Sequence, residues 1–544
     1  MRALVAVVLF FCALLPINEP ARAAGERFPG MTAARWRADL ETFAKLAPER
    51  HGNLYRFMTP EAFAAAVRAL EDKLPQLDDD DAVVAGLARI VASIGDGHDH
   101  VFEPCGNGTS TNYPLRLARF SDGVLVTAAP HALAPVVGSR LVALEGKPIA
   151  AVWNALVPVI PHDHDNDSAS SDATTFLTCS GLLHGLGLIP RPSEAAFTFE
   201  RDGKRTTLRL QPQVSWESTY GLPPRDWDLF VGARVPLVRS SRDLAWFRWI
   251  ESDGVLYVQL NAIANPPGTT LAAFADDVFR AADSHPVRTF VLDLRNNGGG
   301  DNTLEKPLIV GIVRRPALSE RGHLFVITSP ATFSAAQNLI NRLQNYAEPT
   351  FVGEPSGENV NFYGDTAHVQ LPNSGLTIAL AHLYWQDMDP RDRRTATFPE
   401  LAAPATLRDY LEGRDPAYEA ILAHRDDPPL EQTLRTAAQA GYDAALAAYD
   451  TFTRDPVHRY AEVELRVNRL GYVLLRAGDH SAAIALFRVN VERHPQSWNA
   501  WDSLGEGYAA AGDKPRAIAA YERSLELNAD NAGGRDALQR LRGG

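Results

Sequence analysis

Residues 288–301 read Arg-Thr-Phe-Val-Leu-Asp-Leu-Arg-Asn-Asn-Gly-Gly-Gly-Asp. A short, mainly apolar run at 288–294 is followed by Arg-Asn-Asn and three consecutive glycines. An unbroken apolar run of this length is typical of a strand that is buried on both faces of a parallel sheet. The glycines predict a tight turn in which the backbone can approach another group closely. We expect Asp293 and Arg295 to pair and to hold this turn in place.

Further strands and helices alternate on both sides of this segment. Apolar strands are predicted at residues 255–260, 324–328 and 350–353, and helices at residues 271–282 and 334–346. This alternation is typical of an α/β layer fold with a largely parallel sheet. We therefore predict an α/β core at residues 216–425 of a multidomain protein.

The segments before the core predict two smaller domains. Apolar residues at three- and four-residue spacings indicate an N-terminal helical bundle at residues 25–108, and short strands bounded by turn residues indicate a β domain at residues 109–215. Within the β domain, Leu-Glu-Gly-Lys-Pro-Ile at residues 144–149 and the helical stretch after it resemble a PDZ domain, which captures extended peptides. The polar loop at residues 161–167 is interpreted as a solvated surface loop, with a cation site as the alternative.

The C-terminal part of the chain contains a repeat. The apolar and small residues of 467–487 recur 34 residues later, at 501–521, and residues 501–508 have the pattern Trp-x2-Leu-Gly-x2-Tyr. This period and pattern resemble tetratricopeptide repeats, in which the small residues let paired helices approach. We predict an all-α repeat domain at residues 426–544, with a degenerate first helix pair at residues 429–455. The resemblance implies a protein partner for this domain.

The N-terminus has the features of a secretion signal. Arg2 follows the first methionine, residues 4–17 form an apolar run, and Ala21 and Ala23 are the small residues of a cleavage site. The run is shorter than the ~20 residues of a membrane-spanning helix, and an uncleaved anchor is the alternative. We predict a signal peptide at residues 1–24 and a periplasmic or secreted protein without stable membrane insertion.

Charge and cysteine content constrain the partners and the chemistry. The net charge is −13 and the basic residues do not cluster, which argues against a nucleic-acid partner. Cys105 and Cys179 are the cysteines outside the predicted signal. In an oxidising compartment they form either a disulfide or two separate buried thiols, and the sequence does not decide between these.

Four segments, in this order, resemble the tail-specific (carboxy-terminal processing) and tricorn-core serine peptidases. They are Ile-Gly-Asp-Gly-His-Asp-His-Val at 94–101, the strand and glycines at 291–301, Ser-Pro-Ala-Thr-Phe-Ser-Ala-Ala-Gln at 329–337 and Phe-Val-Gly-Glu at 351–354. Each motif is weak alone, but their combination around a PDZ-like insert is specific. The resemblance covers residues 30–425 and implies a serine-type peptidase without a cofactor that hydrolyses unfolded or tail-exposed polypeptides.

Ser334 is the candidate nucleophile. It follows a predicted strand and turn and begins a predicted helix, where a serine most often caps the helix. The free N–H groups of such a helix start also suit an anionic intermediate. The resemblance implies that Ser334 attacks the substrate and that the N–H groups of Gly299 and Ala335 form the oxyanion hole.

His98 is the candidate general base, because the resemblance to the tricorn-like branch implies that the histidine of this motif activates the serine. Two neighbours depart from the family pattern: Gly97 stands where tricorn has a serine, and Asp99 where a small hydroxyl residue is more usual. A metal cluster of Asp96, His98 and His100 is the alternative. No His-Glu-x-x-His helix or similar ligand pattern accompanies it, so we expect no metal site.

The sequence disfavours the lysine base of the other branch, because no lysine lies between residues 306 and 514 and arginine stays protonated. A third, orienting carboxylate is expected beside the histidine. We assign Asp392, which lies in a segment that resembles the family's closing Pro-Asp motif. Glu358 and Asp365 are the alternatives.

Two other functions stay open from the sequence alone. The same fold occurs in retinoid-binding relatives of the family, so a non-catalytic peptide- or ligand-binding protein is one alternative. A repeat scaffold with a vestigial core is the other. The Ser334–His98 pair separates a peptidase from a binder, since a binder has no need of it.

Overall fold

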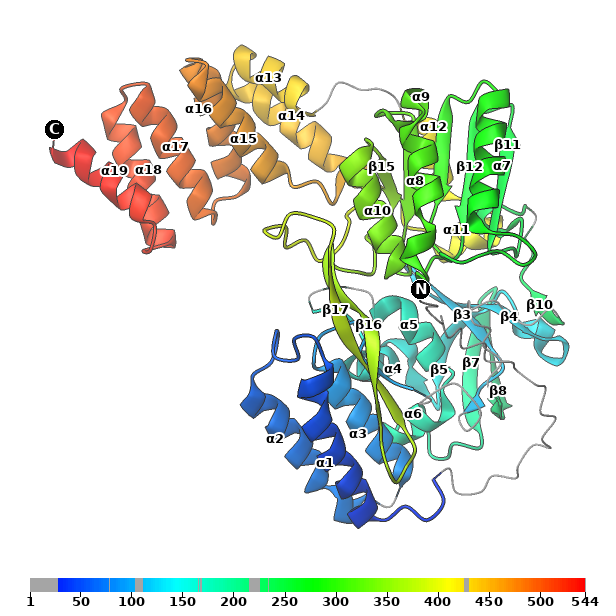
Figure 1. Ribbon diagram of the computed structural model, residues 1–544. Coiled ribbons are helices and arrows are strands. Elements are labelled where there is room, and N and C mark those ends of the chain that lie inside the picture. Colours follow the sequence, from blue (N-terminus) through cyan, green and yellow to red (C-terminus); the bar gives the residue numbers. More distant parts are fainter. Residues whose placement is uncertain are drawn as a thin grey trace, which may run out of the picture.

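The computed structural model describes residues 28–77, 79–102, 111–164, 166, 169–214, 226–232, 234–424 and 430–543. The predicted signal peptide and Cys105 lie outside these residues, whereas Cys179 is described and is disulfide-bonded. The chain has a mixed α/β fold with several sheets and an all-helical C-terminal region (Figure 1). Within the described segments, no helix is both long enough and apolar enough to cross a membrane.

Six strands form the sheet of the α/β core, in the order β11-β12-β13-β14-β15-β18. β11 pairs with β12 in the antiparallel sense, and the other neighbours are parallel. The strands are β11 Ala245–Ile250, β12 Val255–Leu260, β13 Thr289–Asp293, β14 Leu324–Thr328, β15 Thr350–Gly353 and β18 Leu401–Ala402. The apolar strands predicted from the sequence are confirmed at these positions.

Helices cover both faces of this sheet, which explains why its strands are apolar at nearly every position. Leu256 and Val258 of β12 pack with the helices of one face, α7, α8 and α10, whereas Val255 and Tyr257 pack with α12 on the other. Successive side chains of a strand point to opposite faces, so both sets are buried. The helices of the core are α7 Leu271–Ser284, α8 Lys306–Val313, α9 Pro316–Ser319, α10 Ala335–Tyr346, α11 Leu407–Glu412 and α12 Pro416–Ala423.

The N-terminal helices and the β region after them share one hydrophobic cluster, which includes Phe43 and Leu87 from helices and Leu141 and Phe197 from strands. The boundary predicted at residue 108 therefore does not separate two hydrophobic cores. The helices are α1 Ala33–Arg50, α2 Pro60–Glu71, α3 Asp80–Ala92, α4 Ile149–Leu156, α5 Ala169–Phe176 and α6 Ser180–Gly185.

The β region contains a sheet with the order β10-β4-β5-β7-β8, in which β3 also pairs with β4 and β6 with β5. Its strands are β3 Arg116–Phe120, β4 Gly123–Pro130, β5 Arg140–Leu144, β6 Lys147–Pro148, β7 Ala195–Arg201, β8 Lys204–Leu210 and β10 Trp227–Leu229. A separate two-stranded pair consists of β2 Thr111–Asn112 and β9 Gln213–Val214. The short strands predicted for this region from its apolar runs and turn residues are therefore present.

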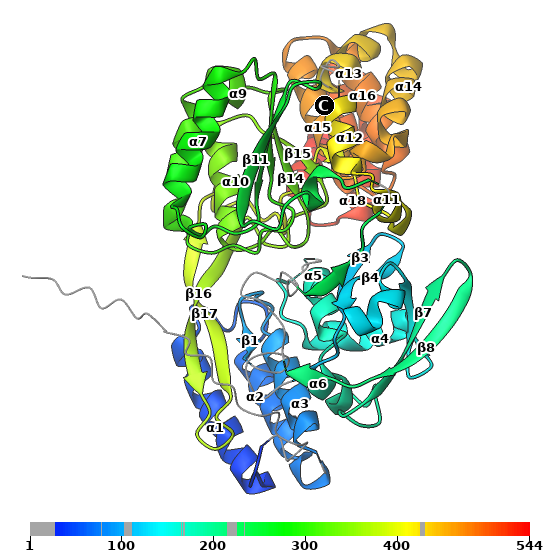
Figure 2. The same ribbon diagram turned by 90° about the vertical axis from the view of Figure 1, so that its right-hand side faces the viewer.

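A long hairpin joins the α/β core to the body formed by the N-terminal helices and the β region (Figures 1 and 2). β16 Asn361–Gln370 and β17 Thr377–Gln386 leave the α/β core and run alongside α1, and β1 His100–Val101 pairs with β17. Val369, Ile378 and Leu380 of the hairpin belong to the hydrophobic cluster of the N-terminal helices. The hairpin therefore connects the segment after His98 to the body that carries Ser334.

Seven α-helices form the C-terminal region over the described residues 430–543. A Cβ atom on Gly471 would lie 2.4 Å from the Phe487 ring, and one on Gly505 would lie 3.0 Å from the Tyr521 ring. The two glycines thus allow matching close contacts between α15 and α16 and between α17 and α18, as expected from the repeat. The helices are α13 Leu430–Ala440, α14 Tyr442–Arg454, α15 Val463–Arg476, α16 His480–Arg493, α17 Trp498–Ala510, α18 Lys514–Leu527 and α19 Ala532–Gly543.

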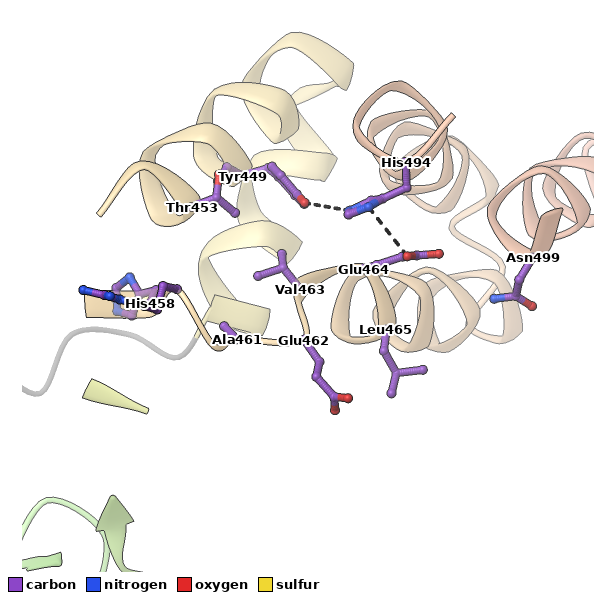
Figure 3. Close-up of a pocket in the computed structure, with 11 residues that line it drawn as sticks. Tyr449, Thr453, His458, Ala461, Glu462, Val463, Glu464, Leu465, His494 and Asn499 are labelled. Carbon is purple, nitrogen blue, oxygen red and sulfur yellow. Dashed lines mark hydrogen bonds and ion pairs between the residues drawn. The ribbon is translucent and has the colours of Figure 1, made fainter. Parts of the chain in front are cut away.

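A cavity of about 540 Å³ lies in this helical region, between α14, α15 and the start of α17 (Figure 3). His494 lies in its wall, with Nε2 2.8 Å from the Tyr449 hydroxyl and Nδ1 3.6 Å from a carboxylate oxygen of Glu464. The cavity therefore has a polar wall built from three helical segments.

Deleting residues 429–544 should leave the rest of the chain folded. The contacts across this boundary are small: Val457 packs against the core cluster that contains Leu401, and the rings of Phe398 and Tyr460 lie 5.9 Å apart. Their loss is expected to reduce the free energy of unfolding by about 1–3 kcal/mol. Circular dichroism and thermal unfolding of the truncated chain measure this effect, and collapse of the α/β core would show that the repeats are part of its fold.

Candidate active site

Ser334 lies at the turn between β14 and α10 and has a strained backbone. Its φ is 54° and its ψ is −124°, a conformation that residues with a side chain rarely adopt. The hydroxyl does not cap α10, so the helix-cap interpretation of this serine is not what the structure contains. Instead, Ser334 Oγ lies 2.9 Å from Nε2 of His98, a residue 236 positions earlier in the chain. Strain of this kind persists only where the surrounding structure enforces it.

Residues that follow β13 enforce this turn. The Thr332 hydroxyl donates to the carbonyl of Leu294 at 2.9 Å, and the N–H of Phe333 donates to the carbonyl of Asn297 at 3.0 Å. The loop after β13 thus holds Thr332 and Phe333, the two residues that precede Ser334.

An ion pair fixes that loop in turn. Arg295 donates to both carboxylate oxygens of Asp293, at 3.0 and 2.9 Å, which confirms the predicted pair. It also donates to both oxygens of Asp415, at 2.9 and 3.0 Å. Asp415 precedes α12, and no pattern in the sequence connects it with this loop. Paired, hydrogen-bonded charges of this kind fix geometry more than they add stability.

His98 lies in the loop after α3, between two aromatic rings. The ring centroids of Phe333 and Phe362 lie 4.6 and 5.8 Å from that of His98, and Phe362 is nearly parallel to it. Asp96 holds the loop, because its carboxylate accepts the N–H of His98 at 3.0 Å. Burial lowers the pKa of His98 to about 4, so the imidazole is neutral at pH 7 and can accept a proton.

Two carboxylates lie beside Nδ1 of this imidazole: Asp96, with Oδ1 at 3.9 Å, and, closer, Glu358. Its Oε2 is 3.6 Å from His98 Nδ1 and accepts the N–H of Ser334 at 3.2 Å. His98 Nδ1 and Glu358 Oε1 are buried and have no hydrogen-bond partner among the described residues. Burial raises the pKa of Glu358 well above its usual range, and the charge of Asp163 raises it further. The arrangement is a serine, a histidine and a carboxylate in series. The contact between His98 and Glu358 is longer than a hydrogen bond, as catalytic contacts often are before a substrate binds.

The assignment of Asp392 as the orienting carboxylate is corrected by this geometry. Asp392 accepts hydrogen bonds from Arg394, one of them at 2.7 Å, and makes no described contact with His98. Asp365, the other alternative, accepts the indole N–H of Trp385 at 2.8 Å. A carboxylate that is already neutralised by an adjacent arginine, as Asp392 is, makes a poor partner for an imidazolium. Of the three acids, Glu358 is the one that the geometry places beside His98 Nδ1.

The structure brings Gly299, Ser334 and Ala335 together but does not leave both predicted donors free. A Cβ atom on Gly299 would lie 2.7 Å from Ser334 Cβ and 2.9 Å from Ala335 N. However, the N–H of Gly299 donates to the side-chain oxygen of Asn297 at 2.9 Å. The N–H of Ala335, at the first position of α10, has no acceptor among the described residues. Of the two groups, Ala335 is therefore the donor available to an anion.

The engagement of Gly299 has a local cause. Asn297 is fully buried, and its side chain also donates to the carbonyl of Leu260 at 2.9 Å. An asparagine that accepts an N–H two residues later is a standard way of closing a turn, and the Asn-Asn-Gly-Gly run contains that signal.

Asp99, which departs from the family pattern, forms a buried pair with His51. The two side chains approach to 3.2 Å, and Asp99 also accepts the N–H of Ala381 in β17 at 2.7 Å. Both side chains are almost fully buried, at 2% and 0% exposure. This pair ties the loop that carries His98 to α1 and to the hairpin, and no pattern around His51 identified it.

Asp163 corrects the interpretation of residues 161–167 as a solvated surface loop. Its side chain is buried, at 2% exposure, and it accepts N–H groups from the segments that contain His98 and Glu358. Asp165 and Asp167 of the same loop lie outside the described residues.

Comparison with known proteins identifies the fold. No family model matches the chain. Two solved structures are similar over most of their length. Mature CPAF complexed with lactacystin has a TM-score of 0.53 and 14% sequence identity, and the match covers 72% of this chain and 97% of that chain. Mature CPAF has a TM-score of 0.52 and 15% sequence identity, and the match covers 78% of this chain and 99% of that chain.

Curated relatives match only a short segment. Superkiller complex protein 3 is 35% identical over 63 residues in Homo sapiens and 36% identical over 63 residues in Mus musculus. These matches span 12% of this chain and only 4% of the relatives' own length. The chain shares the fold of mature CPAF, and the Ser334–His98–Glu358 series lies within that fold.

Proposed function

We propose that this chain is an exported serine peptidase that hydrolyses peptide bonds of unfolded or tail-exposed polypeptides. The observation that carries the proposal is the 2.9 Å contact between Ser334 Oγ and His98 Nε2 at a strained turn. The neutral state of the imidazole, the adjacent carboxylate of Glu358 and the fold shared with CPAF support it.

In the proposed reaction, Ser334 Oγ attacks the carbonyl carbon of the scissile peptide bond and His98 Nε2 accepts the hydroxyl proton. The oxyanion accepts a hydrogen bond from the N–H of Ala335, at the positive end of the α10 dipole. Glu358 accepts the Nδ1–H of the imidazolium and holds its orientation. His98 then returns the proton to the leaving amine, and a water molecule releases the acyl group from Ser334 by the same steps.

The other regions are proposed to bind polypeptides. We assign residues 109–215 as a PDZ-like domain that captures an extended substrate segment through backbone hydrogen bonds. We assign residues 426–544 as tetratricopeptide repeats that bind a protein partner, which the 34-residue period supports. A periplasmic or secreted location follows from the predicted signal at residues 1–24.

Covalent labelling by a fluorophosphonate, measured as a function of pH, tests the nucleophile and its base together. We expect Ser334 to be labelled, with a rate that rises as the pH increases through about 4, because the pKa of His98 has about that value. The rise due to His98 should be complete well before pH 6.5, the ordinary value for a solvated imidazole. Ionisation of Glu358, whose pKa burial raises well above its usual range, adds a separate rise at higher pH. Mass spectrometry of the labelled peptide identifies the residue.

Ser334→Ala is the control for this labelling, since it removes the only atom that is expected to react. A rate that rises instead near pH 6.5 would show that His98 is solvated or is not the base. A wild-type chain that is not labelled at any pH favours a non-catalytic binding protein, the alternative function.

A further inference from the structure

Asp163 joins the two loops that flank the proposed active site. Its Oδ1 accepts the N–H of Gly97 at 2.8 Å, and its Oδ2 accepts the N–H of Asn359 at 2.9 Å. Gly97 immediately precedes His98, and Asn359 immediately follows Glu358. One buried carboxylate therefore sets the distance between the backbone segments that carry the base and its carboxylate partner.

The segment that carries Asp163 comes from the β region, not from the α/β core. It follows a short 3₁₀ helix, Val157–Val159, at the end of α4. Its attachment extends beyond Asp163: the N–H of His164 donates to the carbonyl of Gly95 at 3.0 Å, and the His164 ring stacks on Phe57 at 4.6 Å. The segment is thus held against the loop of His98 through Gly95 and Gly97, and against the residues before α2 through Phe57.

The absence of a side chain at position 97 is part of the same arrangement. A Cβ atom on Gly97 would lie 2.8 Å from the Phe333 ring and 3.3 Å from Asp163 Oδ1. A residue with a side chain would therefore separate the His98 loop from both Phe333 and Asp163. The contact between Asp163 and the His98 loop depends on this glycine.

Asp163 also acts on the charges of the site. Burial lowers the pKa of His98, and the negative charge of Asp163 raises it in part. The same charge adds to the effect of burial in raising the pKa of Glu358. A neutral residue in its place would change both values, even if the backbone did not move.

We propose that Asp163 is a positioning residue of the active site, through which the β region holds His98 and Glu358 in register. This inference rests on the proposed peptidase function. It assigns to the β region a direct part in assembling the catalytic groups, in addition to the capture of substrate.

Steady-state kinetics on an unstructured peptide test the role of Asp163. Asp163→Ala is expected to lower kcat by about 10²-fold with little change in KM, since small displacements of catalytic groups cost about this much. Asp163→Asn keeps an oxygen that accepts the N–H of Gly97 and should lower kcat less. Its loss of charge should also shift the acid limb of the labelling rate to lower pH, because Asp163 raises the pKa of His98.

Asp39→Ala is the matched control. Asp39 is also fully buried and also accepts two backbone N–H groups, from Asn373 at 2.9 Å and Ser374 at 2.8 Å, at the tip of the hairpin. It should leave kcat unchanged. Equal losses of kcat in Asp163→Ala and Asp39→Ala would overturn the inference. An unchanged kcat and an unchanged acid limb in the Asp163 variants would also overturn it. In either case, labelling of wild-type Ser334 would still support the proposed peptidase function.

Amide hydrogen exchange gives a readout that needs no activity. In Asp163→Asn the amide of Asn359 should exchange faster than in the wild type, because it faces an N–H donor instead of a carboxylate oxygen, and the amide of Ala381 should not change. Unaltered exchange at Asn359 contradicts the inference. If the wild-type chain is not labelled at Ser334, but Asn359 exchanges faster in Asp163→Asn, the proposed peptidase function is overturned. The contact between Asp163 and Asn359 would then still be supported.

Discussion

Replacing Ser334 with alanine is expected to reduce peptide hydrolysis by about 10⁴–10⁶-fold, and replacing His98 with alanine should have a similar effect, since the two groups act as one unit. The double variant should be scarcely less active than either single one. The physical reason is that an alcohol without its base is a weak nucleophile, and a base without the alcohol has no proton to accept. Initial rates with an unstructured peptide measure all three variants.

His131→Ala is a matched control for the histidine variant. His131 also lies beside a carboxylate, 2.8 Å from Asp228, but its side chain is 91% exposed on the β region. Its replacement should leave the rate unchanged. If His98→Ala retains most of the activity while Ser334→Ala is inactive, the base is another residue. If the wild type and both variants are equally inert to peptides and to serine-directed reagents, the chain is a binding protein.

Glu358→Gln is expected to lower kcat by about 10²–10⁴-fold, the range that follows when the third member of a catalytic triad is neutralised. A glutamine amide can donate to His98 Nδ1, which leaves the proton on Nε2 and prevents that atom from accepting the proton of Ser334. Glu358 is fully buried, so thermal unfolding of the variant must accompany the kinetic measurement.

Asp392→Asn decides between the two carboxylates. Because Asp392 is paired with Arg394 and makes no described contact with His98, this substitution should change kcat by less than about 3-fold. A large loss in Asp392→Asn together with an active Glu358→Gln would restore the assignment made from the sequence and contradict the geometry described above.

The strands of the α/β core were predictable because they are buried on both faces. β12, β14 and β15 coincide with apolar runs, and such runs carry their own signal. No strand is predicted from the sequence at residues 361–386, where the structure contains β16 and β17. Much of this hairpin lies outside a sheet core, with polar residues such as Asp365 and His368 within it, so its pattern does not separate it from a loop.

The site was partly predictable for a different reason. Ser334 and His98 lie in motifs that resemble a known family, and the structure brings their reactive atoms to 2.9 Å. The orienting carboxylate was predictable only as one of three acids, Asp392, Glu358 and Asp365, because the sequence does not show which loop turns toward the histidine. Asp163 was misread because a buried acid within a polar run looks like a solvated one until its N–H partners are known.

The hairpin also determines when this site comes into existence. His98 and Ser334 are 236 residues apart, and the segment after His98 pairs with a strand that lies beyond Ser334 in the chain. Contacts between such distant segments form late in folding, after local structure. Under the proposed function, a partly synthesised chain has the histidine without the serine and the carboxylate, and cannot carry out the reaction. The proposed hydrolysis therefore requires that the hairpin has folded and joined the loop of His98 to the body that carries Ser334.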